Sequence, residues 1–236
     1  MELWENLITN LGFVGVCIGI FLGLYLLAKL SQRYLPHLHR PSTARKVCII
    51  AICSALASVL YMLDFPLLFL APEFYKLDFS ELPVMLCGFY LGPSAAVVCE
   101  GLKVVLKLLM KGTTTAFVGD FANFAVGCSL VLPAVIVYHT KKCRRSALWG
   151  LIAGTATLTV FGSAFNALYL LPTFAKMFIP MEAILAAGQA IHPAINSLWS
   201  FVLLAVAPLN LIKGVSVSLL TMLLYKKVAR PLFGNG

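Results

Sequence analysis

Charged residues are scarce in this sequence. Asp, Glu, Lys and Arg together make up 11% of the 236 residues, whereas a soluble domain carries about 25%. Hydrophobic residues reach 61%, and the mean hydropathy is +0.94. A core of ordinary size cannot bury this much apolar surface. We therefore expect lipid, rather than water, to be the solvent around most of the chain.

Signatures of common enzyme classes are also missing. The chain has no G-x-x-x-x-G-K-[ST] phosphate loop, no H-E-x-x-H and no G-x-S-x-G motif. Nothing in the sequence therefore indicates ATP hydrolysis, zinc-dependent proteolysis or hydrolysis by a nucleophilic serine. Its seven cysteines include no C-x-x-C pair and are scattered in or beside apolar runs. This pattern argues against a disulfide framework or a zinc site, and we expect the cysteines to be apolar packing residues.

The apolar residues fall into separable runs of membrane-spanning length. We predict an all-α integral membrane protein with one additional N-terminal transmembrane helix followed by a bundle of six. Pro208 is expected to break the last run, which is too long for one straight helix. Residues 64–76 include two prolines and are expected to form a loop or a re-entrant piece. The expected helices cover residues 11–30, 47–63, 79–92, 94–110, 121–138, 147–171 and a final stretch from 196 or 208 to 225.

Basic residues predict the orientation. If the spans alternate, twelve of the 18 Lys and Arg residues fall on one side, in the first linker, in the loop around residues 141–145 and in the tail. That side is predicted to be cytoplasmic, and it includes the C-terminus. The domain prediction follows: residues 1–40 are an extra helix and a basic linker, residues 41–230 are the six-helix domain, and residues 231–236 are a cytoplasmic tail.

The other side collects acids, threonines and prolines in irregular segments. Irregular polar backbone near membrane depth persists only where protein covers it or where it lines a cavity, so these segments predict a pocket open to the outside. Asp78 and Glu81 stand where a helix begins, and there they favour the helix dipole. Capping and contact with a substrate are equally open for this pair. We expect four others to be solvated loop residues, namely Asp64, Glu73, Lys76 and Glu182.

Several polar residues lie within the spans. Glu100 and Lys103 are three residues apart and share a helix face, so they can neutralise each other as a structural pair or serve a function. Lys107 and Lys111 either snorkel or join them. Asn123, Asn166 and Asn210 each carry an amide that must be hydrogen-bonded. These three amides either bridge helices or line a polar ligand site, and we favour the ligand site.

One strip of small residues stands out. Ala51 and Ala55 lie four residues apart in the first core helix. Small residues let another helix approach closely in lipid, so this strip predicts either internal packing or a partner contact.

The order and spacing of five motifs resemble a known family. These motifs are DFSELP (78–83), GFYLGP (88–93), EGLKVVLK (100–107), TTTAFVGDFANFAVG (113–127) and APLNLIKG (207–214). Over about residues 44–230 they are similar to the substrate-binding S components of energy-coupling-factor (ECF) vitamin transporters, and most similar to the riboflavin-specific type. The family usually has six helices, so residues 1–40 lie outside its pattern. Asp120 stands where the family commonly has Glu.

The resemblance implies a substrate site and a docking site. The flat ring of riboflavin would stack on apolar and aromatic side chains, and its polar groups would need fixed partners. Ala51 and Ala55 fall where the family docks on its transmembrane coupling subunit. The residues expected to bind substrate are Asn123, Asn166, Tyr169, Lys176, Asn210, Leu67, Phe69, Glu81 and Asp120.

The resemblance also implies a mechanism. The S component captures vitamin outside the cell, closes a loop over it, docks on a coupling subunit driven by two cytoplasmic ATPases, and topples in the membrane to release the vitamin. No catalytic cofactor is expected, because riboflavin would be the transported ligand. Three alternatives stay open: an S component for another solute, a multispanning membrane enzyme using Asp78, Glu81 and Asp120, and a facilitator that works alone.

Overall fold

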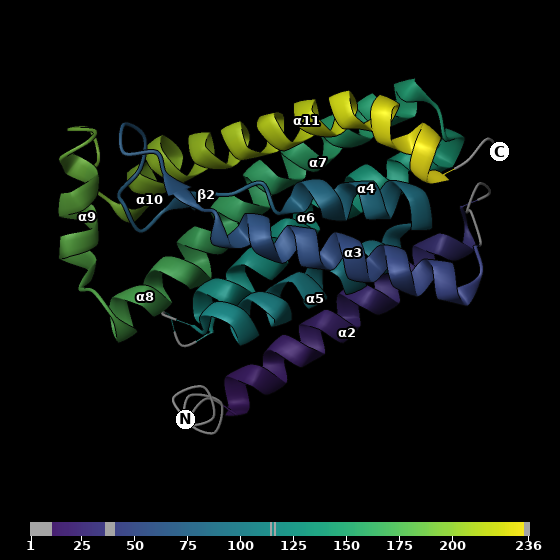
Figure 1. Ribbon diagram of the computed structural model, residues 1–236. Helices are drawn as coiled ribbons and strands as arrows, with labels where there is room; N and C mark the ends of the chain where they lie inside the picture. The colour runs from purple at the N-terminus through teal and green to yellow at the C-terminus, as the bar shows by residue number, and fades with distance from the viewer. Residues whose placement is uncertain (1–10, 36–40, 114, 116, 234–236) are drawn as a thin grey trace.

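Long helices make up almost all of the protein in this computed structural model, which describes residues 11–35, 41–113, 115 and 117–233. Side chains of residues 11–14 and 226–233 are outside that description. The helices lie side by side and run in alternating directions (Figure 1). The main ones are α2 (Leu11–Arg33), α3 (Thr43–Met62), α4 (Glu81–Leu91), α5 (Pro93–Lys111), α6 (Val118–Lys141), α7 (Arg144–Phe165) and α11 (Ala207–Phe233).

Each predicted apolar run forms a helix in the expected order. Among the described residues, five helical stretches are long and apolar enough to cross a membrane. Helix α4 is apolar but has only 11 residues, and α5 carries four charged side chains. The count of one helix plus six therefore stays a prediction. The five stretches are Gly15–Arg33, Thr43–Met62, Val118–Lys141, Arg144–Met177 and Leu198–Tyr225.

The expected break at Pro208 is wrong. Short helix α10 (Leu198–Phe201), a π-helical turn η2 (Val202–Val206) and α11 follow one another without interruption. Proline lacks an N–H and its ring clashes with the carbonyl four residues earlier. The wider π turn, in which the Ala207 N–H donates to the Val202 carbonyl, ends two residues before Pro208 and relieves that clash without ending the helix.

A second π turn repeats this arrangement. Turn η1 (Asn166–Leu170) follows α7 and ends two residues before Pro172, and α8 (Leu171–Met177) continues from it. Asn166 is the first residue of η1, and its carbonyl accepts from the Leu171 N–H. Both π turns lie at the same end of the bundle, next to the cavity described below.

Small residues bring α6 and α7 together. A Cβ atom at Gly150 would lie 2.5 Å from the Ala134 carbonyl oxygen, and one at Gly154 would lie 2.3 Å from the Leu130 oxygen. Only glycine allows this approach, and close backbone contact supplies much of the packing energy between helices in lipid.

Helix α2 crosses the outside of the bundle obliquely and packs on α5 (Figure 1). Ala28 is buried in this contact, and the Ser94 hydroxyl donates to Gln32 Oε1 at 3.0 Å. Most of the other described α2 side chains are exposed. Helix α2 thus packs on the surface of the bundle formed by the other helices.

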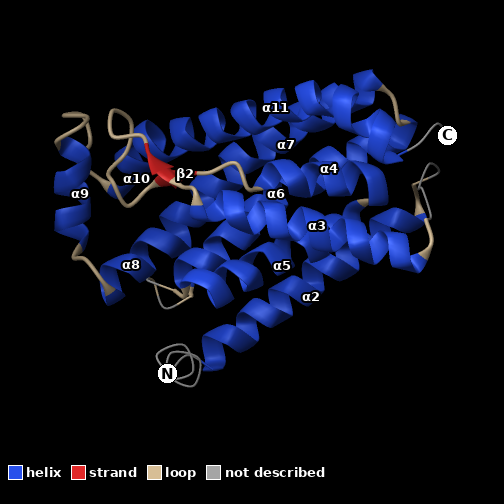
Figure 2. Ribbon diagram, viewed as in Figure 1, coloured by secondary structure: helices blue, strands red, loops and turns tan. Residues whose placement is uncertain are grey.

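The two ends of the bundle differ. At one end, β1 (Phe65–Pro66) and β2 (Lys76–Leu77) form a small antiparallel hairpin, the strand region in Figure 2. Helix α9 (Met181–Gln189) lies across this end (Figure 1). The opposite end holds the basic turn between α6 and α7 and the end of α11.

Candidate functional site

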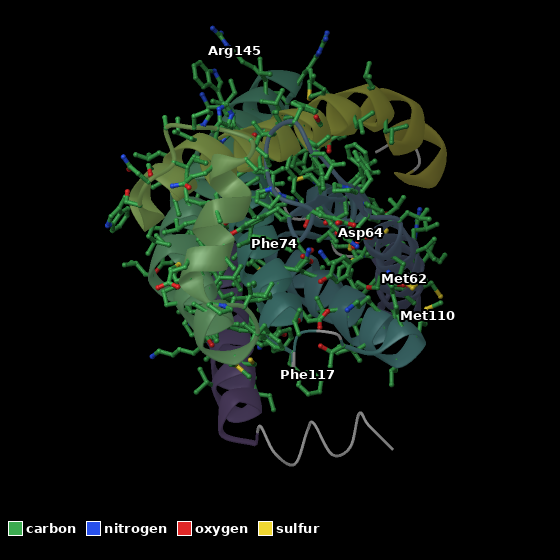
Figure 3. All side chains as sticks on the ribbon, turned by 90° about the vertical axis from the view of Figure 1, so that its left-hand side faces the viewer. Met62, Asp64, Phe74, Met110, Phe117 and Arg145 are labelled. Atoms are coloured by element: carbon green, nitrogen blue, oxygen red, sulfur yellow. The ribbon has the colours of Figure 1, made fainter. Side chains whose placement is uncertain are left out.

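A cavity of about 350 Å³ opens at the end that carries the hairpin and α9. Figure 3 looks onto this end, where Asp64 and Phe74 lie near the middle. Its size is at the lower end of small-molecule sites, which are mostly apolar with a few placed polar groups. The wall is of this kind. Its aromatic members are Tyr61, Phe74, Tyr75 and Phe174, and its amide and lysine members are Asn123, Asn166, Asn210, Lys76, Lys107, Lys111 and Lys213.

The structure brings the three predicted asparagines together on this wall, from α6, η1 and α11. Asn166 is held on both sides: its Oδ1 accepts from the Tyr75 hydroxyl at 2.7 Å and its Nδ2 donates to the Gly162 carbonyl at 2.7 Å. Asn123 Oδ1 and Asn210 Nδ2 are buried and have no hydrogen-bond partner among the described residues. They are an unused acceptor and an unused donor, as a polar ligand site requires.

Lys213 is the charged group on this wall that our sequence reasoning missed. Its Nζ lies 3.0 Å from Asp78 Oδ2 and 3.0 Å from Glu81 Oε1. It belongs to the APLNLIKG motif, and a lysine inside an apolar span was the available signal. Asp78 and Glu81, at the start of α4, are therefore buried partners of Lys213 rather than solvated helix caps.

Asp78 is also bound by Ser80. Its Oδ1 accepts from the Ser80 N–H at 2.9 Å and from the Ser80 hydroxyl. Burial raises the pKa of Asp78, but the ammonium groups of Lys213 and Lys103 and these hydrogen bonds together bring it below its ordinary value. Asp78 is thus ionised and fixes Lys213 at the cavity wall.

Behind this wall, the predicted pair of Glu100 and Lys103 is confirmed. The two side chains are in contact and fully buried. The Lys103 ammonium also lies 3.4 Å from Glu81 Oε1 and donates to Ser80 Oγ at 3.0 Å. A Cβ atom at Gly127 of α6 would overlap Glu100 Oε1, so a larger residue there would displace this carboxyl group from its present position.

Lys107 does not snorkel away from the protein. It lines the cavity, and its Nζ lies 2.5 Å from Asp120 Oδ1. The Tyr61 hydroxyl donates to the same oxygen at 3.3 Å. Lys111 is exposed at the rim of the cavity. Asp120 and Glu81 thus do not line the cavity as charged walls themselves. Asp120 contacts Lys107 and Glu81 contacts Lys213, and these two lysines line the cavity.

Other predicted site residues lie elsewhere. Phe69 is 72% exposed on the hairpin loop. Leu67 packs against the apolar cluster around Phe201 and is not itself among the residues that line the cavity. Tyr169 packs on Phe165 with ring centroids 5.2 Å apart, and Lys176 is exposed on α8. Tyr75, which sequence reasoning did not single out, faces the cavity instead. The Lys76 ammonium lies 3.4 Å from Asp64 in an exposed pair, which agrees with the expected loop setting.

The alanine strip faces outward. Ala51 and Ala55 are exposed on α3, whereas Ser54, Ala57 and Ser58 of the same helix are buried. Internal packing thus occupies a different face, and the strip is open to another helix. Among the described residues, no group of three or more His, Cys, Asp or Glu side chains is placed to hold a metal ion.

Comparison with known proteins agrees with this architecture. Residues 45–225 match the sequence model of the family described as "ECF transporter, substrate-specific component". The matched range omits α2. A solved structure of the S component of a bacterial ECF transporter superposes with a TM-score of 0.64 at 30% identity, covering 80% of this chain and 97% of that one.

Two curated relatives carry a more specific name. The riboflavin transporter RibU of Staphylococcus aureus is 32% identical over 185 residues, which are 78% of this chain and 90% of that protein. The riboflavin transporter FmnP of Bacillus subtilis is 28% identical over 185 residues, covering 78% and 92%.

Proposed function

Since the chain belongs to the family of substrate-specific components of ECF transporters, we propose that it is the high-affinity riboflavin-binding subunit of such an importer. Membership makes it a multi-pass membrane protein and a transport component, not an enzyme. The relatives named as riboflavin transporters support the choice of ligand.

One observation carries the proposal most directly. The cavity combines aromatic and aliphatic walls with Asn123 Oδ1 and Asn210 Nδ2, two buried amide atoms without a protein partner. The flat ring of riboflavin can pack against the aromatic and aliphatic walls. Its ring carbonyls and ribityl hydroxyls can form hydrogen bonds with the two amide atoms. Leaving such amide atoms unpaired costs about 1–3 kcal/mol each, so a polar ligand that pairs them binds favourably.

The cavity is proposed to face the outside of a bacterial plasma membrane. Basic residues collect at the other end of the bundle, on the end of α2, the start of α3 and the α6–α7 turn. Cytoplasmic loops carry such an excess of Lys and Arg. This orientation places the C-terminus in the cytoplasm.

The predicted site residues divide by position. We assign direct contact with the ligand to Asn123, Asn166 and Asn210. Glu81 and Asp120 act indirectly, because Glu81 holds Lys213 and Asp120 holds Lys107 at the cavity wall. Four residues remain predictions, because they lie away from the cavity wall or on the hairpin loop: Leu67, Phe69, Tyr169 and Lys176.

Docking is proposed at Ala51 and Ala55. Their exposure on α3 lets a helix of a transmembrane coupling subunit approach the backbone closely. That subunit would be driven by two cytoplasmic ATPases, since this sequence carries no phosphate loop. Toppling of the docked chain would then deliver the vitamin inside.

A binding panel on the purified chain tests the proposal. Riboflavin and a set of other vitamins are titrated, and uptake is measured in vesicles that contain this chain alone. We expect saturable riboflavin binding and no uptake. Binding of another vitamin in place of riboflavin would make the chain an S component for that solute, and uptake without a coupling module would make it a facilitator.

A further inference from the structure

The buried network behind the cavity contains more acids than bases. Three carboxyl groups and two ammonium groups meet between the start of α4, α5 and α11, and each residue is at most 8% exposed. Its hydrogen bonds and ion pairs join all five into one cluster. The members are Asp78, Glu81, Glu100, Lys103 and Lys213.

Neighbouring elements do not supply the missing positive charge. Helix α6 presents Gly127 and Cys128 to the cluster, and α3 presents the ring of Tyr61, 5.4 Å from the Lys103 ammonium. The nearby Lys107 and Asp120 balance each other. With every carboxyl group ionised, the cluster would therefore hold one uncompensated negative charge. Burying such a charge is very costly, and a buried group neutralises instead.

The contacts identify which acid is least compensated. Asp78 accepts from Lys213 and twice from Ser80. Glu81 Oε1 faces both ammonium groups, at 3.4 Å and 3.0 Å. Glu100 contacts only Lys103, which it shares with Glu81. The second oxygen, Oε2, of both Glu81 and Glu100 is buried without a partner among the described residues, so it is the number of ammonium contacts that makes Glu100 the less compensated of the two.

We infer that Glu100 is a proton-binding site, neutral at ordinary pH, with the proton on Oε2. Its Oε1 then still accepts from the Lys103 ammonium, because a carboxylic acid carbonyl is also an acceptor. With this proton in place, two ammonium groups balance two carboxylates. Lys103 stays available to Glu81, and Glu81 and Asp78 together hold Lys213 at the cavity wall.

Release of the proton has a predictable consequence. An ionised Glu100 would draw Lys103 from Glu81 and add one buried negative charge. In the unfolded chain Glu100 ionises at a pH of about 4.3, whereas the folded protein retains the proton. Stability therefore falls as the pH rises above that value, until the folded protein also loses the proton. The link from this site to vitamin binding through Lys213 rests on the proposed function, but the proton itself does not.

Two matched variants test the inference by thermal unfolding in detergent over a range of pH. Glu100→Gln keeps a neutral side chain of the same shape in the folded protein but cannot ionise in the unfolded chain. Its unfolding temperature is therefore expected to match that of the wild type at acid pH and to exceed it at neutral and alkaline pH. Glu81→Gln has equal burial and similar volume, but it removes a carboxylate that two ammonium groups share, and the unfolding temperature drops. Loss of folding or equal destabilisation in Glu100→Gln would overturn the inference.

Infrared spectroscopy of the ligand-free protein reads the proton directly. The wild type and Asp64→Asn, a change in an exposed pair outside the cluster, are expected to show a carboxylic acid C=O band that shifts in D₂O, and Glu100→Gln is expected to lack it. A wild type without that band, or a band that survives Glu100→Gln, contradicts the assignment. A parallel riboflavin titration separates the two proposals, since failure to bind flavin leaves the infrared result standing.

Discussion

The ammonium of Lys213 lies 3.0 Å from Oδ2 of Asp78, and 135 residues of sequence separate the two. The pair is buried, and Glu81 lies equally close to the same ammonium. This contact ties α11 to the start of α4 directly at the cavity wall.

Removing that ammonium is expected to destabilise the fold. Lys213→Met leaves Asp78 and Glu81 short of a positive charge, and breaking a buried ion pair costs about 3–5 kcal/mol. Thermal unfolding in detergent measures the loss. Lys76→Met is the control, because Lys76 forms an exposed pair with Asp64 and such pairs contribute at most about 1 kcal/mol. Equal losses in the two variants would show that Lys213 is not structurally special.

A glycine supports the same network. Gly127→Ala places a methyl group against the Glu100 carboxyl group, and overpacking of this kind costs about 1–3 kcal/mol. The comparison variant is Gly19→Ala on α2, where a Cβ atom meets nothing within 4 Å. That change is expected to leave stability unchanged or raise it by up to about 1 kcal/mol. If Gly127→Ala unfolds at the wild-type temperature, Glu100 does not occupy this space.

The two unpaired amides predict the polar contacts of the ligand. Asn123→Ala and Asn210→Ala each remove one hydrogen bond of about 1–1.5 kcal/mol, which corresponds to roughly tenfold weaker riboflavin binding. Fluorescence titration gives the dissociation constants. Gln189→Ala, an exposed amide on α9, should bind as the wild type does. Unchanged affinity in both asparagine variants would remove them from the site.

The exposed alanine strip predicts a separation of binding from transport. Ala51→Leu and Ala55→Leu fill the surface where a partner helix is proposed to approach, so vitamin uptake by the complete transporter should fall while riboflavin binding is retained. Ala164→Leu, which alters an exposed alanine on α7, serves as the control. Uptake at the wild-type level in both strip variants would place the docking surface elsewhere.

Much of the fold could be predicted from composition and spacing. Apolar runs of spanning length located the helices, because lipid imposes both length and hydrophobicity. The three asparagines were found because an amide inside a span needs a partner. The Glu100–Lys103 pair followed from helix geometry, since residues three apart share a face.

Long-range contacts and side-chain direction could not be predicted in this way. Nothing local connects Lys213 with Asp78, because their meeting depends on how α11 packs on α4. Tyr169 was expected to bind the same ligand as Asn166, three residues earlier. In the structure Asn166 lines the cavity, whereas the Tyr169 ring packs on Phe165 with ring centroids 5.2 Å apart. Phe69 has the right chemistry for a flavin, but the hairpin loop presents it to the exterior.

The most direct test of the central claim is a structure of the protein crystallised with riboflavin. The account predicts flavin density in the cavity at the hairpin end, with polar atoms of the ligand within hydrogen-bonding distance of Asn123 Oδ1 and Asn210 Nδ2. Flavin bound elsewhere on the protein, or an empty cavity at saturating riboflavin, would contradict it.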